Sequence, residues 1–294
     1  MELVTAMTWR NSVPAPLIRA GRRLSVKAGG ASAGLRARPD FILVGAQRCG
    51  TTSLFRALMA HPQILRPVLH KGVNYFDVNY SRGERWYQGH FPLAAVARAR
   101  TAKQGPPRVF DASGYYMYHP AAPERIAKDL PAVKLIAMLR DPVERAYSAY
   151  QHELARGFEW ETFERALDLE VERLVGEIER MRSDPTYESF THRHHSYTRR
   201  GHYAEQLAVF LELFGPERLL VIDSEAFFTD PGAEYKRIVD FLDVVPFQPA
   251  RFDRYNARPR AAMSSQTRSR LEEHFRPHDE HLEHLLHRRL TWRT

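Results

Sequence analysis

Short apolar runs alternate with helical stretches along most of the chain. Four runs of five to seven residues stand out, at Phe41–Ala46, Arg108–Ala112, Val133–Leu139 and Arg218–Asp223. Because these runs are apolar on both faces and are separated by helices, they predict a parallel sheet covered on two sides. No internal repeat and no low-complexity linker follows residue 39, which favours one α/β domain.

The segments between the runs carry signals for the start and end of helices. Asp141 followed by Pro142 predicts an N-cap and a first helical residue, and this helix is expected to end at Arg156, before a glycine. Asp230 and Pro231 repeat the start signal. The other expected helices are Thr51–His61, Tyr203–Phe214, Tyr235–Leu242 and a longer amphipathic helix over Glu161–Arg182.

Composition and charge are those of a globular protein. Hydrophobic residues make up 44% of the 294 residues, and the mean hydropathy is −0.47. No stretch of 18 apolar residues occurs, which excludes a membrane-spanning helix. Residues 1–38 carry seven basic side chains and one acid, so they hold +6 of the net charge of +8. The remaining 256 residues are nearly neutral, so the pI of about 9.7 does not indicate a nucleic-acid ligand.

Residues 1–38 are also poor in large apolar side chains, and we expect a poorly ordered basic leader before one domain over residues 39–294. Arginines interrupt each apolar run of the leader, which argues against a signal peptide. A solvated tail is favoured, and weak contact with an anionic membrane surface is the alternative. Cys49 is the one cysteine, so no internal disulfide forms and a cytoplasmic protein is expected.

The most informative segment is a connection from a strand to a helix, FILVGAQRCGTTS, at residues 41–53. It keeps both glycines and the final hydroxyl, Thr52, of the nucleotide-triphosphatase loop G-x-x-x-x-G-K-[ST]. Thr51 replaces the lysine that reaches the β- and γ-phosphates, and a cation stands earlier, at Arg48. Backbone amides and a helix N-terminus still suit an anion. The loop therefore predicts a site for a 5′-phosphate that bears one further anionic group near Arg48.

Two features of this loop have plainer explanations. A glycine turn that binds nothing would explain the glycines, although Arg48 and the paired threonines weigh against it. We interpret Cys49 as a small loop side chain, because nothing in the sequence supplies the base and acyl substrate of a catalytic thiol.

A second anion site is predicted in the segment VKLIAMLRDPVERAYSAY. Arg140 follows a strand and Ser148 lies eight residues later on the next helix. Ligands of open α/β sheets collect at the carboxyl ends of strands, so the two loops are expected to hold two phosphates of one nucleotide. Arg140 offers a planar fork and Ser148 a short donor. Taken alone, Arg140 is equally consistent with an ion pair to Asp141 or Glu144, and Arg145 with a surface position.

Together the two segments resemble the motifs of sulfotransferases that use 3′-phosphoadenosine 5′-phosphosulfate. FILVGAQRCGTTSL is similar to the family's 5′-phosphosulfate loop, and LRDPVERAYSAY to its 3′-phosphate motif, R-x-P-x-x-R-x-x-S-x-Y. The heparan sulfate sulfotransferase branch and its bacterial relatives are nearest in pattern. The likeness covers most of residues 39–250 and includes His70–Asp77, Asp111–Tyr116, Arg200–Glu205, Val221–Glu225 and Asp230–Pro231. The two motifs in this order, about 90 residues apart, are highly specific.

The resemblance implies a P-loop-like three-layer α/β sandwich with a central parallel sheet and helices on both faces. It implies 3′-phosphoadenosine 5′-phosphosulfate as the sulfonate donor, and an acceptor of unknown identity. The residues expected to hold the nucleotide are Arg48, Cys49, Gly50, Thr51, Thr52, Ser53, Arg140, Ser148 and, from a weaker match, Arg258. A solvated basic loop is the alternative for Arg258. Arg48 stands where the family usually has lysine, which keeps the charge and changes its geometry.

The family's catalytic base is the feature that this sequence lacks. The acceptor must lose a proton as it attacks, so a base is needed within hydrogen-bond reach. The heparan-type branch uses a glutamate, and its position here is Gly72. The nearby candidates for catalysis are His70, Asp77 and Asp111, with Lys71 as a cation near the leaving group. The alternatives are a loop-orienting Asp111, a surface His70, and an acceptor acidic enough to need no base.

Two groups of histidines are left. His278, His281, His284 and His287 recur every three residues, a spacing that drifts around a helix, so we expect a solvated face and no metal. Candidates for the acceptor cleft are His192, His194 and His195 with Tyr115, Tyr116 and Tyr118. Buried packing explains the tyrosines equally well.

We therefore predict a sulfotransferase that moves a sulfonate to a hydroxyl or amine of a glycan, glycolipid, phenol or other small molecule. One alternative is a non-catalytic nucleotide-binding relative, which Gly72 keeps open. The other is a P-loop kinase, which predicts a loop lysine where the sequence has Thr51.

Overall fold

The computed structural model describes residues 29–68, 72–255 and 262–293. At its centre is a five-stranded sheet in the order β2-β3-β1-β4-β5, with all neighbours parallel. The strands are β1 (Phe41–Gly45), β2 (Ile64–Leu65), β3 (Arg108–Ala112), β4 (Lys134–Leu139) and β5 (Leu219–Asp223). All residues of β1 are buried, as an apolar run in a sheet covered on both faces should be.

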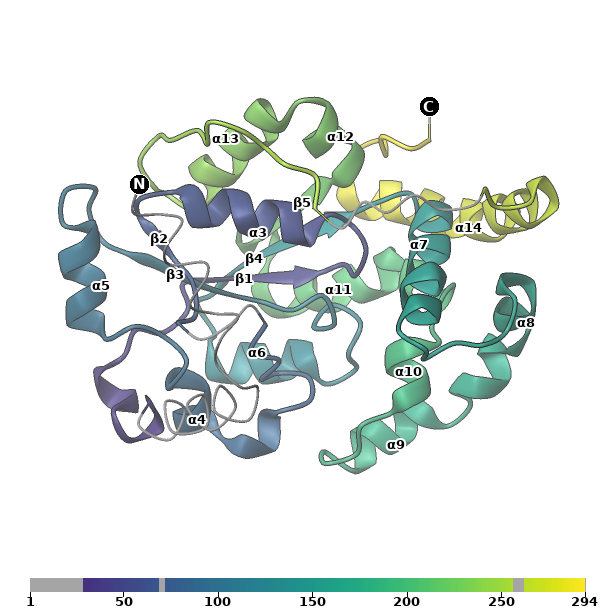
Figure 1. Cartoon of the computed structure of the whole chain (residues 1–294), viewed down its shortest axis with the longest axis horizontal. Helices are drawn as coiled ribbons and strands as arrows, with labels where there is room; N and C mark the ends of the chain where they lie inside the picture. The colour runs from purple at the N-terminus through teal and green to yellow at the C-terminus, as the bar shows by residue number, and fades with distance from the viewer. Residues whose placement is uncertain (1–28, 69–71, 256–261, 294) are drawn as a thin grey trace, which may run out of the picture.

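Helices cover both faces of this sheet (Figure 1). One face carries α3 (Thr51–Ala60), α12 (Ser224–Thr229) and α13 (Pro231–Phe241), and the other α6 (Ala122–Asp129) and α11 (Tyr203–Phe214). The predicted three-layer α/β sandwich with a central parallel sheet is therefore confirmed. The strand β2 was not predicted, because two residues are too few for a periodic pattern.

A second group of helices stands beside the carboxyl ends of the strands (Figure 1). It comprises α7 (Pro142–Ala155), α8 (Phe163–Leu174), α9 (Glu177–Ser183), α10 (Phe190–His194) and α14 (Ser265–Leu286). Two short helices, α4 (Glu84–Gln88) and α5 (Ala94–Thr101), and four 3₁₀ turns, η2 (Ala33–Leu35), η3 (Tyr80–Arg82), η4 (Arg199–Gly201) and η5 (Pro216–Arg218), complete the described elements.

The structure confirms the predicted N-caps but not the predicted long helix over Glu161–Arg182. The carboxylate of Asp141 accepts a hydrogen bond from the backbone N–H of Val143 at 2.8 Å, and Asp230 caps α13 in the same way. The helix expected over Glu161–Arg182 is wrong, since the chain forms α8 and α9 with a break at Gly176. Gly176 has a φ of 73°, in the left-handed region that glycine adopts without a steric penalty.

The predicted boundary at Pro39 also needs revision. Residues 29–38 have defined structure, and Arg36 pairs with Leu93 in an antiparallel bridge. The Nη2 of Arg38 donates to the carbonyl oxygen of Asp129 at 2.8 Å. The end of the expected disordered leader is thus packed on the domain, while residues 1–28 lie outside the described part of the chain.

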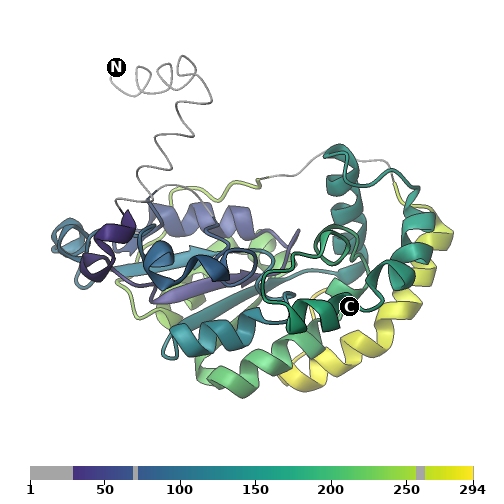
Figure 2. The same cartoon turned by 90° about the horizontal axis from the view of Figure 1, so that it is seen from below.

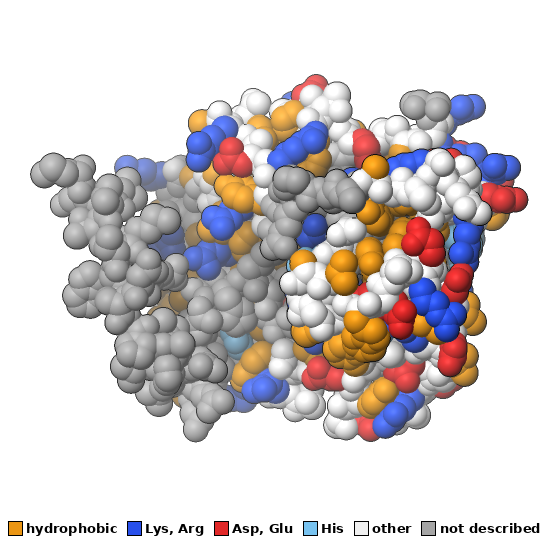
Figure 3. Space-filling view, turned by 45° about the vertical axis from the view of Figure 1, so that its right-hand side comes forward, with side chains coloured by type: hydrophobic (Ala, Val, Ile, Leu, Met, Phe, Trp, Pro, Cys, Tyr) orange, Lys and Arg blue, Asp and Glu red, His pale blue; other side chains and the backbone are white. Residues whose placement is uncertain are grey.

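The described residues form no membrane-spanning helix, and the face drawn in Figure 3 carries no dominant charge. None of the helices formed by the described residues has the length and apolar character needed to cross a bilayer. In Figure 3, basic and acidic side chains are interspersed with neutral ones. This agrees with the near-neutral charge of the chain after the leader.

Candidate functional site

The two predicted phosphate segments meet at the carboxyl edge of the sheet. β1 and β4 are neighbours, so the loop after Gly45 and the segment after Leu139 start side by side. The chain continues from β1 to strands on one side of it and later places β4 on the other side. This is a topological switch point, where α/β sheets bind their ligands. The Nε of Arg48 donates to the Oγ of Ser148 at 3.0 Å and joins the two segments directly.

The loop leaves the start of α3 open to an anion. Gly50 is the N-cap, with a φ of 85°, and as a glycine it has no side chain of its own to cap the helix. The first amides of a helix have no partners within it, and they favour negative charge. Arg48 also has a left-handed backbone, with a φ of 70°. The predicted nucleotide residues Gly50, Thr51 and Thr52 therefore form the start of a helix, whose first amides favour an anion.

Cys49 and Ser53 direct their side chains elsewhere. The Sγ of Cys49 is buried 3.7 Å from the hydroxyl of Tyr203, and burial raises the pKa of the thiol to about 11. A protonated, buried thiol agrees with the interpretation of Cys49 as a small loop side chain. The Oγ of Ser53 accepts a hydrogen bond from the backbone N–H of Tyr255 at 3.0 Å. This bond ties the segment that leads toward Arg258 to α3, but Arg258 itself lies outside the described residues.

Arg140 lies at the end of β4, beside two acids. Its Nη2 is 3.5 Å from the Glu144 carboxylate and its Nε is 3.9 Å from Glu225. The side chain is 28% exposed, and ion pairs this long and this solvated contribute at most ~1 kcal/mol. The ion pair that we weighed is therefore present, and it is loose enough for a phosphate to compete for the guanidinium.

Arg145 is a residue whose importance the sequence interpretation missed. A surface position is wrong, because the side chain is fully buried and donates to the carbonyl oxygen of Tyr197. Its Nε and Nη1 find no hydrogen-bond partner among the described residues. A buried cation with open donors is costly unless an anion approaches. Its position as the second arginine of R-x-P-x-x-R-x-x-S-x-Y was the available signal.

Asp111 has the environment of a structural carboxylate. It is fully buried, and its Oδ2 accepts from the hydroxyls of Tyr116 at 2.9 Å and Tyr87 at 3.2 Å. Its Oδ1 accepts from the N–H of Ala112 at 2.8 Å. Burial raises the pKa of this carboxyl. This arrangement favours the loop-orienting alternative for Asp111. Two of the other catalytic candidates, His70 and Lys71, lie outside the described residues.

Asp77 is the candidate that the structure brings next to the loop. Its Oδ2 accepts a hydrogen bond from the Oγ of Ser113 at 2.8 Å, directly after β3. The next residue, Gly114, packs on Gln47 of the phosphate loop. Burial raises the pKa of Asp77 to about 6. A carboxylate with this pKa is ionised at neutral pH and can still accept a proton.

The position of the family's glutamate has a physical reason to be glycine here. Gly72 has a φ of 72°, and a Cβ at this residue would lie 3.3 Å from the carbonyl oxygen of Ala112. A glutamate would therefore be strained in this backbone.

An aromatic and basic cluster flanks the loop. The hydroxyl of Tyr115 and the Nδ1 of His192 are 2.7 Å apart, and the Tyr118 ring stacks on His192 with centroids separated by 4.2 Å. Arg200 lies 4.9 Å from the centroid of each tyrosine ring and donates to the side-chain oxygen of Gln47. Three of the six predicted cleft residues are thus brought together, and Arg200 is an addition that the sequence interpretation lacked.

The other three residues weighed for the cleft have other partners. They form hydrogen bonds from His194 to Glu153, from His195 to the carbonyl of Phe158, and from Tyr116 to Asp111. Of the six predicted cleft residues, three therefore border the phosphate loop and the other three form hydrogen bonds that support the fold.

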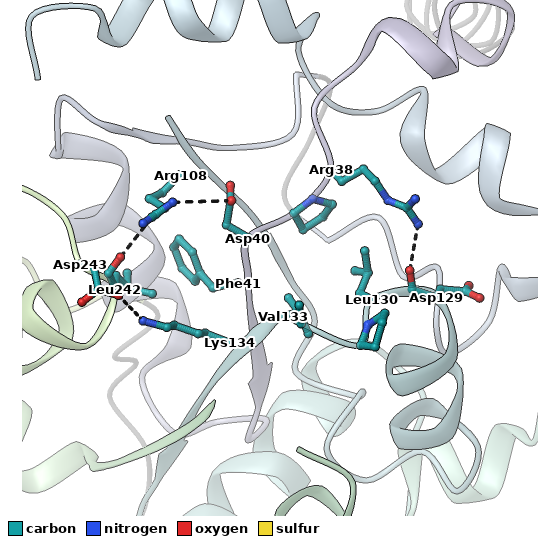
Figure 4. Close-up of a pocket in the computed structure, with 13 residues that line it drawn as sticks. Arg38, Asp40, Phe41, Arg108, Asp129, Leu130, Val133, Lys134, Leu242 and Asp243 are labelled. Atoms are coloured by element: carbon teal, nitrogen blue, oxygen red, sulfur yellow. Dashed lines mark hydrogen bonds and ion pairs between the residues drawn. The ribbon is translucent and has the colours of Figure 1, made fainter. Parts of the chain in front are cut away.

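A separate cavity of about 410 Å³ opens at the opposite edge of the sheet (Figure 4). Its basic side chains face acids or carbonyls, as in the pairs Arg108–Asp40 and Lys134–Asp243. It lies at the amino ends of β1 and β4, away from the loop. We therefore place the functional site at the carboxyl edge.

Comparison with known proteins agrees with this geometry. Residues 38–283 match the sulfotransferase domain family. The chain belongs to the sulfotransferase family. Both the family and the fold class expected from the two motifs are therefore confirmed, and the match weighs against the P-loop kinase alternative.

This sulfotransferase resembles both curated proteins and a solved structure. It is 29% identical over 282 residues to human bifunctional heparan sulfate N-deacetylase/N-sulfotransferase 3, covering 85% of the chain and 30% of that protein. The Drosophila melanogaster bifunctional heparan sulfate N-deacetylase/N-sulfotransferase is 28% identical, with 71% and 20% covered. The chain thus spans less than a third of the length of these relatives. A sulfotransferase structure from Alicyclobacillus acidocaldarius is 31% identical, with a TM-score of 0.66, and covers 88% of this chain and 100% of that one.

Proposed function

We propose that this sulfotransferase moves a sulfonate from 3′-phosphoadenosine 5′-phosphosulfate to a hydroxyl or amine of an acceptor. The observation that carries the proposal is the contact between Arg48 and Ser148, which unites the loop after β1 with the motif after β4. The uncapped start of α3 supports it, because an anion would complete that helix end. The side chains that fit the donor are one arginine in each segment, Arg48 and Arg140, and the short hydroxyl of Ser148.

The same contacts suggest how the donor lies. The amides of Gly50 to Thr52 hold the 5′-phosphate, and Arg140 and Ser148 hold the 3′-phosphate. The Oγ of Ser148 accepts from Arg48, and its own proton is still available for a phosphate oxygen. Arg48 then stands beside the sulfonate.

The transfer is an in-line displacement at sulfur. A lone pair of the acceptor oxygen or nitrogen forms the new bond to sulfur while the bond between sulfur and the bridging phosphate oxygen breaks. Its electron pair stays on the 5′-phosphate, where Arg48 stabilises the growing charge. Ser113 takes the acceptor proton and passes its own proton to Asp77.

The acceptor would enter beside Tyr115, Tyr118 and Arg200, which present two aromatic faces and a cation near the loop. We favour a glycan, because the named relatives are heparan sulfate N-sulfotransferases. Glycolipid, phenol and other small acceptors are the alternatives. A cytoplasmic location stays our prediction, supported by the unpaired, buried Cys49.

The deciding experiment transfers labelled sulfonate from the donor to a panel of acceptors. It is paired with calorimetry of 3′-phosphoadenosine 5′-phosphate and of ATP, each with and without Mg²⁺. We expect transfer to at least one acceptor and metal-independent preference for the desulfonated nucleotide. Nucleotide binding without transfer to any acceptor, and without loss of sulfonate to water, supports the non-catalytic alternative. Mg²⁺-dependent preference for ATP contradicts the proposal.

A further inference from the structure

Three histidines from two helices meet on the side of the domain where α14 packs against α11 (Figure 2). His202 is the N-cap of α11, and His274 and His278 lie one turn apart on α14. Each offers a ring nitrogen, and these three atoms lie within 4.8 Å of one another. The spacing of α14 alone did not reveal this group, because His202 is 72 residues away from His274.

The hydrogen-bond partners of His202 indicate which of its ring nitrogens carries the lone pair that faces His274. The Nε2 atoms of His202 and His274 are 3.0 Å apart, so one of them carries the hydrogen and the other accepts. The Nδ1 of His202 is 3.5 Å from the carboxylate of Glu205, which favours a hydrogen on that Nδ1. His202 Nε2 is then the unprotonated nitrogen that faces its neighbours.

The group has an unsatisfied member in the protein alone. His202 is 5% exposed, and its Nδ1 lies 3.5 Å from the Glu205 carboxylate without a well-aligned hydrogen bond to any of the described residues. The rings of His202 and His278 stack with centroids 3.5 Å apart, and burial lowers the pKa of both imidazoles. Each neutral imidazole has one N–H donor and one nitrogen lone pair, so neighbouring imidazoles cannot all donate and accept with one another. A cation would instead bind the lone pairs.

We propose that His202, His274 and His278 bind one divalent transition-metal ion, with Zn²⁺ as the preferred ion. Three imidazoles suit zinc, cobalt, copper or nickel rather than the oxygen-seeking Mg²⁺ and Ca²⁺. A tetrahedral zinc ion with 2.0–2.1 Å bonds needs ligand nitrogens about 3.4 Å apart. The Nε2 atoms of His202 and His274 are 3.0 Å apart, and all three ligand atoms lie within 4.8 Å of one another. The rings of His202 and His278 are stacked, so His278 must turn out of this parallel arrangement before both lone pairs can reach one ion. His278 is half-buried and His274 is exposed, and these two are the side chains that would turn. Glu205 would hold the Nδ1–H of His202 as an outer partner.

The site is separate from the sulfonate-transfer residues and independent of their assignment. It would fasten α14 to the N-cap residue of α11, His202. The residues before and after His202 reach the nucleotide segments, since Arg200 donates to Gln47 and Tyr203 donates to the carbonyl of Arg140 at 2.9 Å. The ion would thus brace the helix end on which these contacts depend.

The test uses the full chain, purified without a histidine tag, stripped with a chelator and reloaded with Zn²⁺ or Co²⁺. Metal content and competition with a chromophoric chelator give stoichiometry and affinity. We expect one tightly bound ion per chain, with the visible Co²⁺ bands of a four-coordinate site. His274→Ala and His278→Ala should each lose more affinity than the ~10–100-fold expected for the outer partner in Glu205→Ala.

The matched controls are His281→Ala and His284→Ala, which remove exposed histidines of the same helix outside the group. They should bind the ion as the unmodified chain does, and only these and the unmodified chain should gain melting temperature with Zn²⁺. His274 is exposed, so its substitution should leave the fold intact, as circular dichroism would check. Retention of the ion by the double variant His274→Ala/His278→Ala, or no ion retained by the unmodified chain, overturns the proposal.

Discussion

At the scale of single residues, our proposal gives the two arginines different roles, with Arg140 at the 3′-phosphate of the donor and Arg48 beside its sulfonate. The 3′-phosphate beside Arg140 is the same before and after transfer, so Arg140→Ala should mainly raise the KM for the donor. Charge grows on the 5′-phosphate near Arg48 only during transfer, so Arg48→Ala should lower kcat by ~100-fold, or ~3 kcal/mol. Steady-state kinetics with varied donor, together with calorimetry of the desulfonated nucleotide, separate the two effects.

An exposed arginine of α8, Arg165, offers a control of equal charge, and Arg165→Ala should leave both constants unchanged. If Arg48→Ala changes only KM while Arg140→Ala abolishes turnover, the orientation of the nucleotide across the two segments is reversed.

Asp77 links activity to pH and stability. Its pKa is raised to about 6 in the fold, from 3.8. The folded state therefore binds this proton more tightly, and the associated stability, ~3 kcal/mol, is present below pH ~4 and lost as pH rises through ~6. Asp77→Asn, which cannot ionise, should melt higher than the unmodified chain at about pH 8, by less at about pH 5, and with little difference only below pH ~4.

The same substitution should remove the rise of kcat with an apparent pKa of about 6. Asp111→Asn is the comparison, since Asp111 accepts from two tyrosine hydroxyls and the Ala112 amide and not from Ser113, so this variant should keep the rise of kcat with pH. An unaltered pH profile in Asp77→Asn would exclude Asp77 as the base.

At the residue level, the sequence predicted that the two local motifs would lie together. Arg48 and Ser148 belong to contiguous motifs, and the structure joins them. Arg145 and Arg200 were missed because a charged residue signals exposure in a sequence, while their burial arises from elements distant in the chain. The absence of the family's glutamate could be noticed from Gly72, but the left-handed backbone that favours glycine at this position could not be predicted.

At the scale of elements, the start of α7 positions Ser148 and follows Arg140. Asp141→Ala removes the N-cap and should cost ~1 kcal/mol of stability, and it should also weaken donor binding. Asp230→Ala removes the equivalent cap of α13, away from the 3′-phosphate motif, and should cost a similar amount with unchanged donor affinity. Chemical denaturation and calorimetry measure the two quantities. Equal loss of donor affinity in both variants would show a general effect of stability.

The elements with strong local signals were predicted to within a residue or two. Apolar runs specified β1, β3, β4 and β5, and caps specified α7. The break between α8 and α9 was missed because one glycine interrupts a continuous amphipathic pattern, and that pattern alone does not report φ. Sequence periodicity shows which face of an element is apolar, whereas the partner of that face depends on the whole fold.

At the scale of the whole molecule, the packed residues 29–38 should contribute to stability. A chain that starts at Pro39 loses the hydrogen bonds of Arg36 and Arg38 and the buried side chain of Ala33. Compared with a chain that starts at Gly29, it should be less stable by ~1–3 kcal/mol in urea unfolding. The chain from Gly29 serves as the control. It should match the full chain, since residues 1–28 belong to the leader that is predicted to be a solvated tail. Equal midpoints for all three would contradict the role of residues 29–38.

The short stretch from Arg200 to Tyr203 touches three places at once: Gln47 of the phosphate loop, His274 of α14 and the backbone of Arg140. Because this one stretch contacts all three places, nucleotide binding and ion binding would influence each other. By thermodynamic reciprocity, whatever factor an ion on the α14 side adds to nucleotide affinity, the nucleotide must add to the affinity for the ion. The donor site and the far helix would then act as a single cooperative unit whose coupling factor is the same from either end.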